Sequence, residues 1–178
     1  IMNEELTTTK IGKYLNLEDF CTCTNTYQKY SAKISPFPKN IESIEAIKDL
    51  NKFIIDPIID RFGVEKFKLT YGFCSPKLKS YLEKKDPITS KKNGRIDPTR
   101  DQHMAHEINS NGKYYCDRLG ASCDFLVIDK TSNVIVDWIL EEKIPFDSLY
   151  FYGKNRPIHI SYGSQHKRDI WAFVATGQ

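Results

Sequence analysis

The sequence has no run of about 18 apolar residues, the length a helix needs to cross a bilayer. The N-terminal stretch IMNEELTTTKIGKYL also lacks the charged start, apolar segment and small-residue cleavage site of an export signal. These absences exclude a membrane-spanning helix. They lead us to expect a protein that stays in a cytoplasm.

Cysteine is scarce and irregularly spaced. The chain has five, an odd number, which favours reduced thiols over a disulfide framework. The pair in CTC at 21–23 lacks the second pair that a four-thiol metal site would need. We interpret that pair as structural.

The net charge of +3 is too small to require a nucleic-acid partner. Basic residues do gather in KKNGRIDPTR at 91–100, but Gly, Pro and Asp interrupt the run. A solvated loop is the simpler interpretation of this segment. Binding of a polyanion by the same loop is the alternative.

A hydrophobic content of 40% over 178 residues is enough for one compact domain. The clearest element is a helix over 43–63, with Ser43 as a suitable N-cap, a kink at Pro57 and an end at Gly63. The patterns then predict a strand over 67–72, a capped helix over 75–85 and a loop over 86–101.

A buried strand over 123–128 and a helix over 132–143 follow, the helix packing Val134, Ile135, Trp138 and Ile139 inward. SLYFYG, PIHISYG and IWAFVAT predict three strands joined by short turns. This order indicates an α+β fold with a mostly antiparallel sheet and flanking helices. One domain over 1–178 suffices, with 1–40 as a less certain N-terminal extension.

A histidine interrupts the apolar strand pattern of PIHISYG. His159 shares a strand face with Ser161, opposite Ile158 and Ile160. A single strand histidine is usually a hydrogen-bonded structural residue. Polar residues elsewhere offer it partners in DQHMAHE (101–107) and GASCDFLV (120–127).

His103, Asp124 and His159 together would supply two imidazoles and a carboxylate. This set suits Zn²⁺ with a fourth position left for water. Bound zinc would lower the pKa of that water towards about 7. Sequence spacing alone does not establish the site.

The chain resembles the zinc peptidases of the D-Ala-D-Ala carboxypeptidase family, especially its short phage-type branch of L-alanyl-D-glutamate endopeptidases. The family pattern runs SGYRS, SQHMxGxAxD, FDQLI and WIHISY. The matching stretches here are LTYGFCSP (69–76), QHM (102–104), GASCD (120–124), PFDSL (145–149) and IHISY (158–162). The resemblance covers roughly residues 40–175 and implies the fold shared with the Hedgehog signalling domain.

By this resemblance His103, Asp124 and His159 are the zinc ligands. The interval of 21 residues between His103 and Asp124 is longer than in the family, so residues 104–119 are interpreted as an insertion. Such a loop is allowed because closure entropy grows slowly with length. A gap-free alignment would put Asp117 in the first ligand's place, and we prefer the insertion because it retains a nitrogen ligand.

Two departures bear on catalysis. The arginine of SGYRS is Cys74 here, and the acid three residues before the last histidine is Arg156, which cannot act as a base because its guanidinium stays protonated. Glu107, on the same face as His103 if HMAHE is helical, and Asp147 in the FDSL element are candidate replacements for the acid/base. His106 is another. Arg156 itself could restore the positive charge lost at Cys74.

We therefore expect a zinc-dependent amide hydrolase with a peptide or another amide-containing substrate. Cell-wall peptides are one such substrate, and they would be reached only through a lysis partner or a virion. A non-hydrolytic module that binds a ligand or protein is the first alternative. The second is a metal-free interaction protein whose contact surface is the aromatic strip Tyr150, Phe151 and Tyr152.

Overall fold

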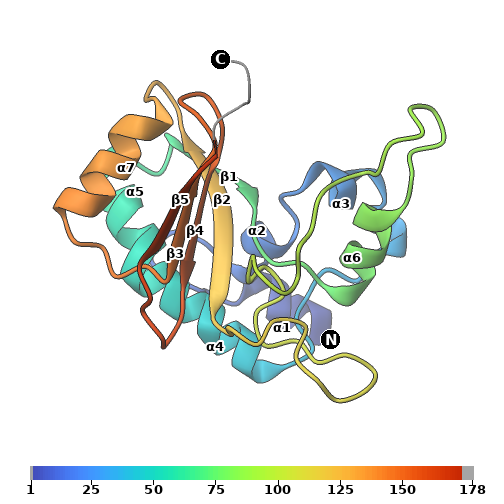
Figure 1. The fold of residues 1–178 in the computed structure, drawn as a ribbon. Helices are drawn as coiled ribbons and strands as arrows, with labels where there is room; N and C mark the ends of the chain where they lie inside the picture. The colour runs from blue at the N-terminus through green and yellow to red at the C-terminus, as the bar shows by residue number, and fades with distance from the viewer. Residues whose placement is uncertain (1, 174–178) are drawn as a thin grey trace.

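The computed structural model describes residues 2–173. These residues form an α+β fold in which helices flank a five-stranded mixed sheet of order β1-β2-β4-β3-β5 (Figure 1). The strands are β1 (Phe67–Tyr71), β2 (Ala121–Val127), β3 (Ser148–Phe151), β4 (Ile158–Tyr162) and β5 (Asp169–Ala172). Each of them lies within or overlaps a stretch that the sequence pattern predicts as strand.

The sheet is mixed because its last pair runs parallel. The β1–β2, β2–β4 and β3–β4 pairs are antiparallel, as expected. A short connection after β4 reverses the chain and carries β5 past β3, so that β5 runs parallel to β3 at the edge of the sheet. Residues 174–176 of the predicted strand IWAFVAT lie outside the described part of the chain.

The long predicted helix is present but irregular. It consists of α4 (Ile41–Leu50), a π-helical turn η2 (Asn51–Ile55) and α5 (Asp56–Phe62), and Gly63 ends it with φ +100°. Pro57 lacks an N–H and crowds the carbonyl four residues before it, and the wider π turn directly upstream relieves that crowding. The predicted cap was wrong: Asn40 caps the helix, and Ser43 is buried within it.

Helices cover both faces of the sheet. Figure 1 shows α5 and α7 (Ser132–Glu141) on one side, and α3 (Asn25–Lys29) and α6 (Pro76–Glu83) on the other. In α7, Ile135 and Ile139 are buried as predicted, whereas Val134 is 44% exposed. Ser75 caps α6 by accepting a hydrogen bond from the backbone N–H of Leu78.

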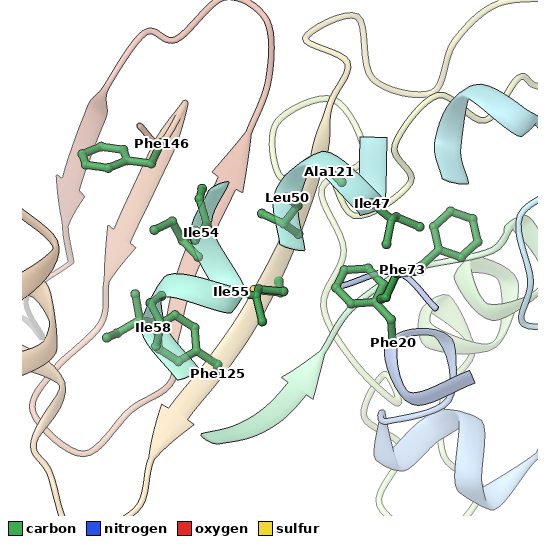
Figure 2. Close-up of a cluster of buried hydrophobic side chains, with 14 of the residues drawn as sticks. Phe20, Ile47, Leu50, Ile54, Ile55, Ile58, Phe73, Ala121, Phe125 and Phe146 are labelled. Carbon is green, nitrogen blue, oxygen red and sulfur yellow. The ribbon is translucent and has the colours of Figure 1, made fainter. Parts of the chain in front are cut away.

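The main hydrophobic core lies between the sheet and the long helix. Figure 2 shows Ile54 and Ile58 of this helix near Phe125 of β2, and Ile47 near Phe73. The side chains of Ile158 and Ile160 in β4 belong to the same cluster. The strand alternation therefore places His159 on the opposite face of the sheet, where the polar residues gather.

The N-terminal residues pack into this core as well. They form α1 (Met2–Thr8), α2 (Leu17–Cys21), α3 and a short 3₁₀ turn η1 (Ser31–Lys33). Leu17 and Phe20 of α2 are fully buried in the main cluster. Residues 1–40, predicted as an extension, thus contribute directly to the same core. Among the described residues, no helix is both long enough and apolar enough to cross a bilayer.

Candidate metal centre

The candidate site is built on one row of residues that crosses the sheet. Tyr71 of β1 lies opposite Asp124 of β2, Asp124 lies opposite His159 of β4, and His159 lies opposite Tyr150 of β3. Directly opposed residues on neighbouring strands share a face and lie about 5 Å apart. The register of three strand pairs therefore brings a carboxylate and an imidazole together between two tyrosines.

His103 reaches this row from a turn that precedes β2. The neighbouring Gln102 has φ +62°, an unfavourable conformation for a non-glycine residue that the surroundings must hold. The buried amide of Gln102 donates to the Leu119 carbonyl at 2.6 Å and to the Asp147 carboxylate at 2.9 Å. These bonds fix the turn and direct the His103 ring onto Tyr71, with stacked centroids 3.7 Å apart.

The two imidazoles converge on one oxygen of Asp124. His103 Nδ1 lies 2.7 Å from the Gly72 carbonyl, which only accepts, so Nδ1 carries the hydrogen and Nε2 is left to face Asp124 Oδ1 at 3.2 Å. His159 Nδ1 lies 2.8 Å from the same oxygen. A carbonyl that orients a histidine in this way is the usual second partner of a metal-bound imidazole.

The geometry leaves room for a cation among the three side chains. One ligand atom from each of His103, Asp124 and His159 can be chosen so that all lie within 4.8 Å of one another. Ligand atoms around a tetrahedral zinc ion lie about 3.3 Å apart, so small side-chain shifts suffice. His103 Nε2 and His159 Nδ1 are the nitrogens that face the Asp124 carboxylate. The three residues can hold a metal ion.

Charge coupling within the group is strong. Burial alone would raise the pKa of Asp124, but His103 and His159 hold it well below its usual range. Burial lowers the pKa of His103, and the Asp124 carboxylate more than offsets this, so the net shift is upward. In the metal-free protein, the ionised Asp124 therefore makes protonation of His103 more favourable than that of a free imidazole.

The three ligands open into a pocket with a volume of about 480 Å³. Both histidines are 3% exposed, whereas the Asp124 side chain is 26% exposed. The remaining lining residues are aromatic, basic and acidic: Tyr71, Tyr150, Tyr152, Phe173, Arg95, Arg100, Arg156, Asp97 and Asp101, together with Ile96 and Pro157. A small organic ligand fits a pocket of this size.

The structure brings the three predicted metal ligands together, but it does not bring all of the predicted catalytic residues to them. It brings His103, Asp124 and His159 together and leaves Asp117 exposed and outside the group, as the insertion interpretation requires. Arg156 lines the pocket. Cys74, which stands where the resemblance predicts an arginine, is buried in a second hydrophobic cluster and does not line the pocket.

HMAHE is not helical, so the condition under which Glu107 would share a face with His103 is not met. Residues 103–106 form a turn, and Ala105 has φ +49°, which a right-handed helix does not allow. Glu107 therefore leaves the His103 face: its buried carboxylate accepts hydrogen bonds from the Lys39 N–H, the Asn40 N–H and the Ser43 hydroxyl. His106 lines a different pocket and accepts a hydrogen bond from the Gly120 N–H.

We expect Glu107→Gln to lower stability and to leave catalysis and metal binding intact. A neutral amide accepts hydrogen bonds from these three donors less well than a carboxylate, and hydrogen bonds to a charged group contribute about 1.5–3 kcal/mol each. We predict a loss of about 2 kcal/mol in urea unfolding, with the zinc content unchanged. Loss of zinc or turnover in a folded Glu107→Gln protein would restore it as a candidate base.

Asp147 also lies away from the pocket. It is fully buried and accepts hydrogen bonds from Gln102, from Arg118 at 3.1 Å and from the Lys167 N–H. It thus positions the turn that carries His103 and does not line the pocket. Besides Asp124, the carboxylates that line the pocket are those of Asp97 and Asp101. Sequence reasoning missed these two because they lie in a segment predicted only as a loop.

The structure divides the predicted aromatic strip: Tyr152, just after β3, is 38% exposed, whereas Tyr150 is buried. Tyr150 is 4% exposed and stacks on the His159 ring at 4.6 Å between centroids. It forms a wall of the site, which weakens the metal-free interaction alternative. Strand alternation could have indicated this, because Tyr150 and His159 both lie on the polar face.

Comparisons of the chain with family models, with curated proteins and with solved structures gave no match.

Proposed function

We propose that the chain is a zinc-dependent hydrolase of an amide bond, with peptidase-like chemistry. The supporting observation is the convergence of His103 Nε2 and His159 Nδ1 on one Asp124 oxygen in the wall of a pocket. Catalytic zinc sites have three protein ligands of this kind and an open position, whereas structural sites have four. The group found among the described residues has three members.

Zinc bound to such a set would polarise a carbonyl and lower the pKa of a bound water. His103 and His159 would hold it through Nε2 and Nδ1, and the Gly72 carbonyl keeps the His103 ring in the required orientation. Tyr71 and Tyr150 stack on these two rings and shield them from water. The chain thus supplies a set of candidate ligands whose two imidazole rings are fixed in orientation and shielded from water.

Amide hydrolysis also needs a group that accepts a proton and later returns it to the leaving amine. Apart from Asp124, the carboxylates that line the pocket are those of Asp97 and Asp101, and we propose that one of them serves. Arg156 stays protonated and would stabilise negative charge on the attacked carbonyl oxygen. Burial raises the pKa of Tyr150, so its phenol remains a hydrogen-bond donor near neutral pH.

The test is metal analysis of protein purified without added zinc, followed by turnover of a cell-wall stem peptide and a general amide panel. We expect about one zinc per chain, turnover that a chelator abolishes, and recovery on adding zinc. Zinc without turnover of any amide would favour the binding-module alternative. Absence of bound metal at micromolar zinc would contradict the proposal.

We expect the stabilisation by zinc to increase with pH. The raised pKa of His103 means that its proton stabilises the metal-free fold below about pH 6.5 and that this stabilisation is lost as pH rises through the folded-state pKa. Zinc needs the neutral imidazole, so protons compete with it. Thermal unfolding with zinc and with chelator should give a larger difference in Tm at about pH 8 than at about pH 5.5.

A further inference from the structure

The sequence predicts the basic segment 91–100 as a solvated loop, with binding of a polyanion as the alternative. In the structure, residues of this segment line the pocket of the candidate metal centre. Arg95 and Arg100 of this segment line it together with Arg156 of the β3–β4 connection. The three guanidinium groups therefore come from two parts of the chain that are far apart in sequence. Both parts border the candidate metal centre.

These arginines are not committed to partners within the protein. Among the described residues, Arg95 and Arg156 have no carboxylate within 4.0 Å, and Arg100 has only a 3.7 Å contact with Asp97. Arg118, by contrast, pairs with Asp147 at 3.1 Å and with Asp169 at 3.3 Å. Arg118 is thus paired with carboxylates within the protein, whereas the three pocket arginines are exposed and available to a ligand.

The pocket carries a net positive charge once a metal is present. Three arginines balance the three aspartates that line the pocket, so a divalent ion with two neutral histidine ligands leaves a net charge of +2. The Asp101 carboxylate already accepts hydrogen bonds from the N–H groups of His103 and Asp97. The Asp97 carboxylate accepts one from the Thr99 hydroxyl.

Aromatic side chains line the pocket together with the arginines. Tyr152 stacks on Phe173 with centroids 4.9 Å apart, and Phe173 contacts Tyr150 edge-on at 5.9 Å. Arg95 is close enough to Tyr152 to favour its phenolate, although burial has the larger effect and raises the phenol's pKa. Ionic contacts made beside such apolar walls are less screened than contacts in open solvent.

We infer that this site, if it hydrolyses amides as proposed, is specific for acidic peptides that carry at least two carboxylates near the scissile bond. A carboxylate pairs in bidentate fashion with one guanidinium, so three uncommitted guanidinium groups match a ligand with more than one anionic group. Arg95, Arg100 and Arg156 are the specificity-determining residues. Neutral amides bind weakly.

The test is calorimetric titration of the zinc-loaded protein at low salt with four tripeptides. Acetyl-Glu-Glu-Glu and acetyl-Gln-Gln-Gln are each used as the free acid and as the C-terminal amide. We expect the free acid of the Glu peptide to bind at least about 30-fold more tightly than the amide of the Gln peptide, and its affinity to fall with added salt. Glu side chains and the terminal carboxylate should both contribute.

Arg95→Gln, Arg100→Gln and Arg156→Gln should each weaken binding of the Glu peptide about 5- to 10-fold. Arg95→Gln and Arg100→Gln, at positions that have no role in the proposed hydrolysis, should leave binding of the Gln peptide amide unchanged. Arg61→Gln is the matched control, because Arg61 is exposed on α5 and does not line this pocket. Thermal unfolding confirms that each variant is folded. Unchanged affinity in all three pocket variants would overturn the inference.

Three other outcomes would also overturn it. These are equal affinity for the Glu and Gln peptides, dependence on the terminal carboxylate alone, and tighter binding of inorganic tripolyphosphate than of the Glu peptide. Because the readout is binding, it is separable from the proposed function. Tight binding of the Glu peptide without any turnover supports recognition of acidic peptides and contradicts amide hydrolysis. Equal turnover of the Glu and Gln peptides supports amide hydrolysis and contradicts recognition of acidic peptides.

Discussion

Replacement of His159 by alanine is expected to remove the metal and, with it, all zinc-dependent turnover. The change deletes one of three ligands and leaves Asp124 with a single imidazole partner. Loss of a group that only supports a ligand typically weakens metal binding 10- to 100-fold, so loss of the ligand itself should exceed about 100-fold. Zinc content after dialysis should fall from about one equivalent to less than about 0.1.

His166→Ala provides the control for this experiment. His166 is an exposed histidine in the β4–β5 connection and is not part of the metal group. Its replacement should leave zinc content, turnover and Tm unchanged. A His159→Ala protein that kept one zinc with unchanged affinity would show that the metal binds elsewhere.

Replacement of Asp147 by alanine is expected to have the largest effect on stability. Its buried carboxylate accepts hydrogen bonds from Gln102, Arg118 and the Lys167 N–H. Removing one partner of a buried ion pair costs about 3–5 kcal/mol. Asp169 would still contact Arg118, but the Gln102 amide and the Lys167 N–H would lose Asp147 as an acceptor. Urea unfolding of the metal-free protein should show a loss of this size.

Asp169→Ala is the control that separates the contribution of the buried Asp147 from that of any carboxylate paired with Arg118. Asp169 contacts the same guanidinium at 3.3 Å, but its side chain is 42% exposed, so its loss should cost no more than about 1 kcal/mol. Equal losses for the two variants would contradict a buried anchor at Asp147. Asp147→Ala should also weaken zinc binding, because Gln102 precedes His103 and would lose one of its fixed contacts.

Local patterns predicted most of the secondary structure. The strand alternation of IHISY places Ile158 and Ile160 in the core and His159 on the polar face, as the structure confirms. The same patterns failed where a distant contact decided the outcome. Ser43 was expected to cap a helix because of its position, but it donates a hydrogen bond to the buried Glu107, 64 residues away.

The turn after Gln102 shows why Glu107 does not lie beside the candidate ligands. HMAHE is compatible with a helix in composition, but contacts with distant residues, among them those of Gln102 with Leu119 and Asp147, hold the chain in a turn with positive φ. Because this segment is not helical, the Glu107 side chain does not lie beside His103. Its carboxylate instead accepts hydrogen bonds from the backbone N–H groups of Lys39 and Asn40. Helical spacing carries no information about such contacts.

The sequence by itself determined the strands, the helices after residue 40, the division of β4 into an apolar and a polar face, and, through the resemblance, which three residues to test as metal ligands. Only the tertiary structure decided that Asp124 and His159, 35 residues apart, share a register and an oxygen-to-nitrogen distance of 2.8 Å. It alone also placed Arg95 and Arg100 at the same pocket. The physical reason is that strand register and loop placement depend on packing between distant segments, whereas periodicity reports only which face of its own element a residue occupies.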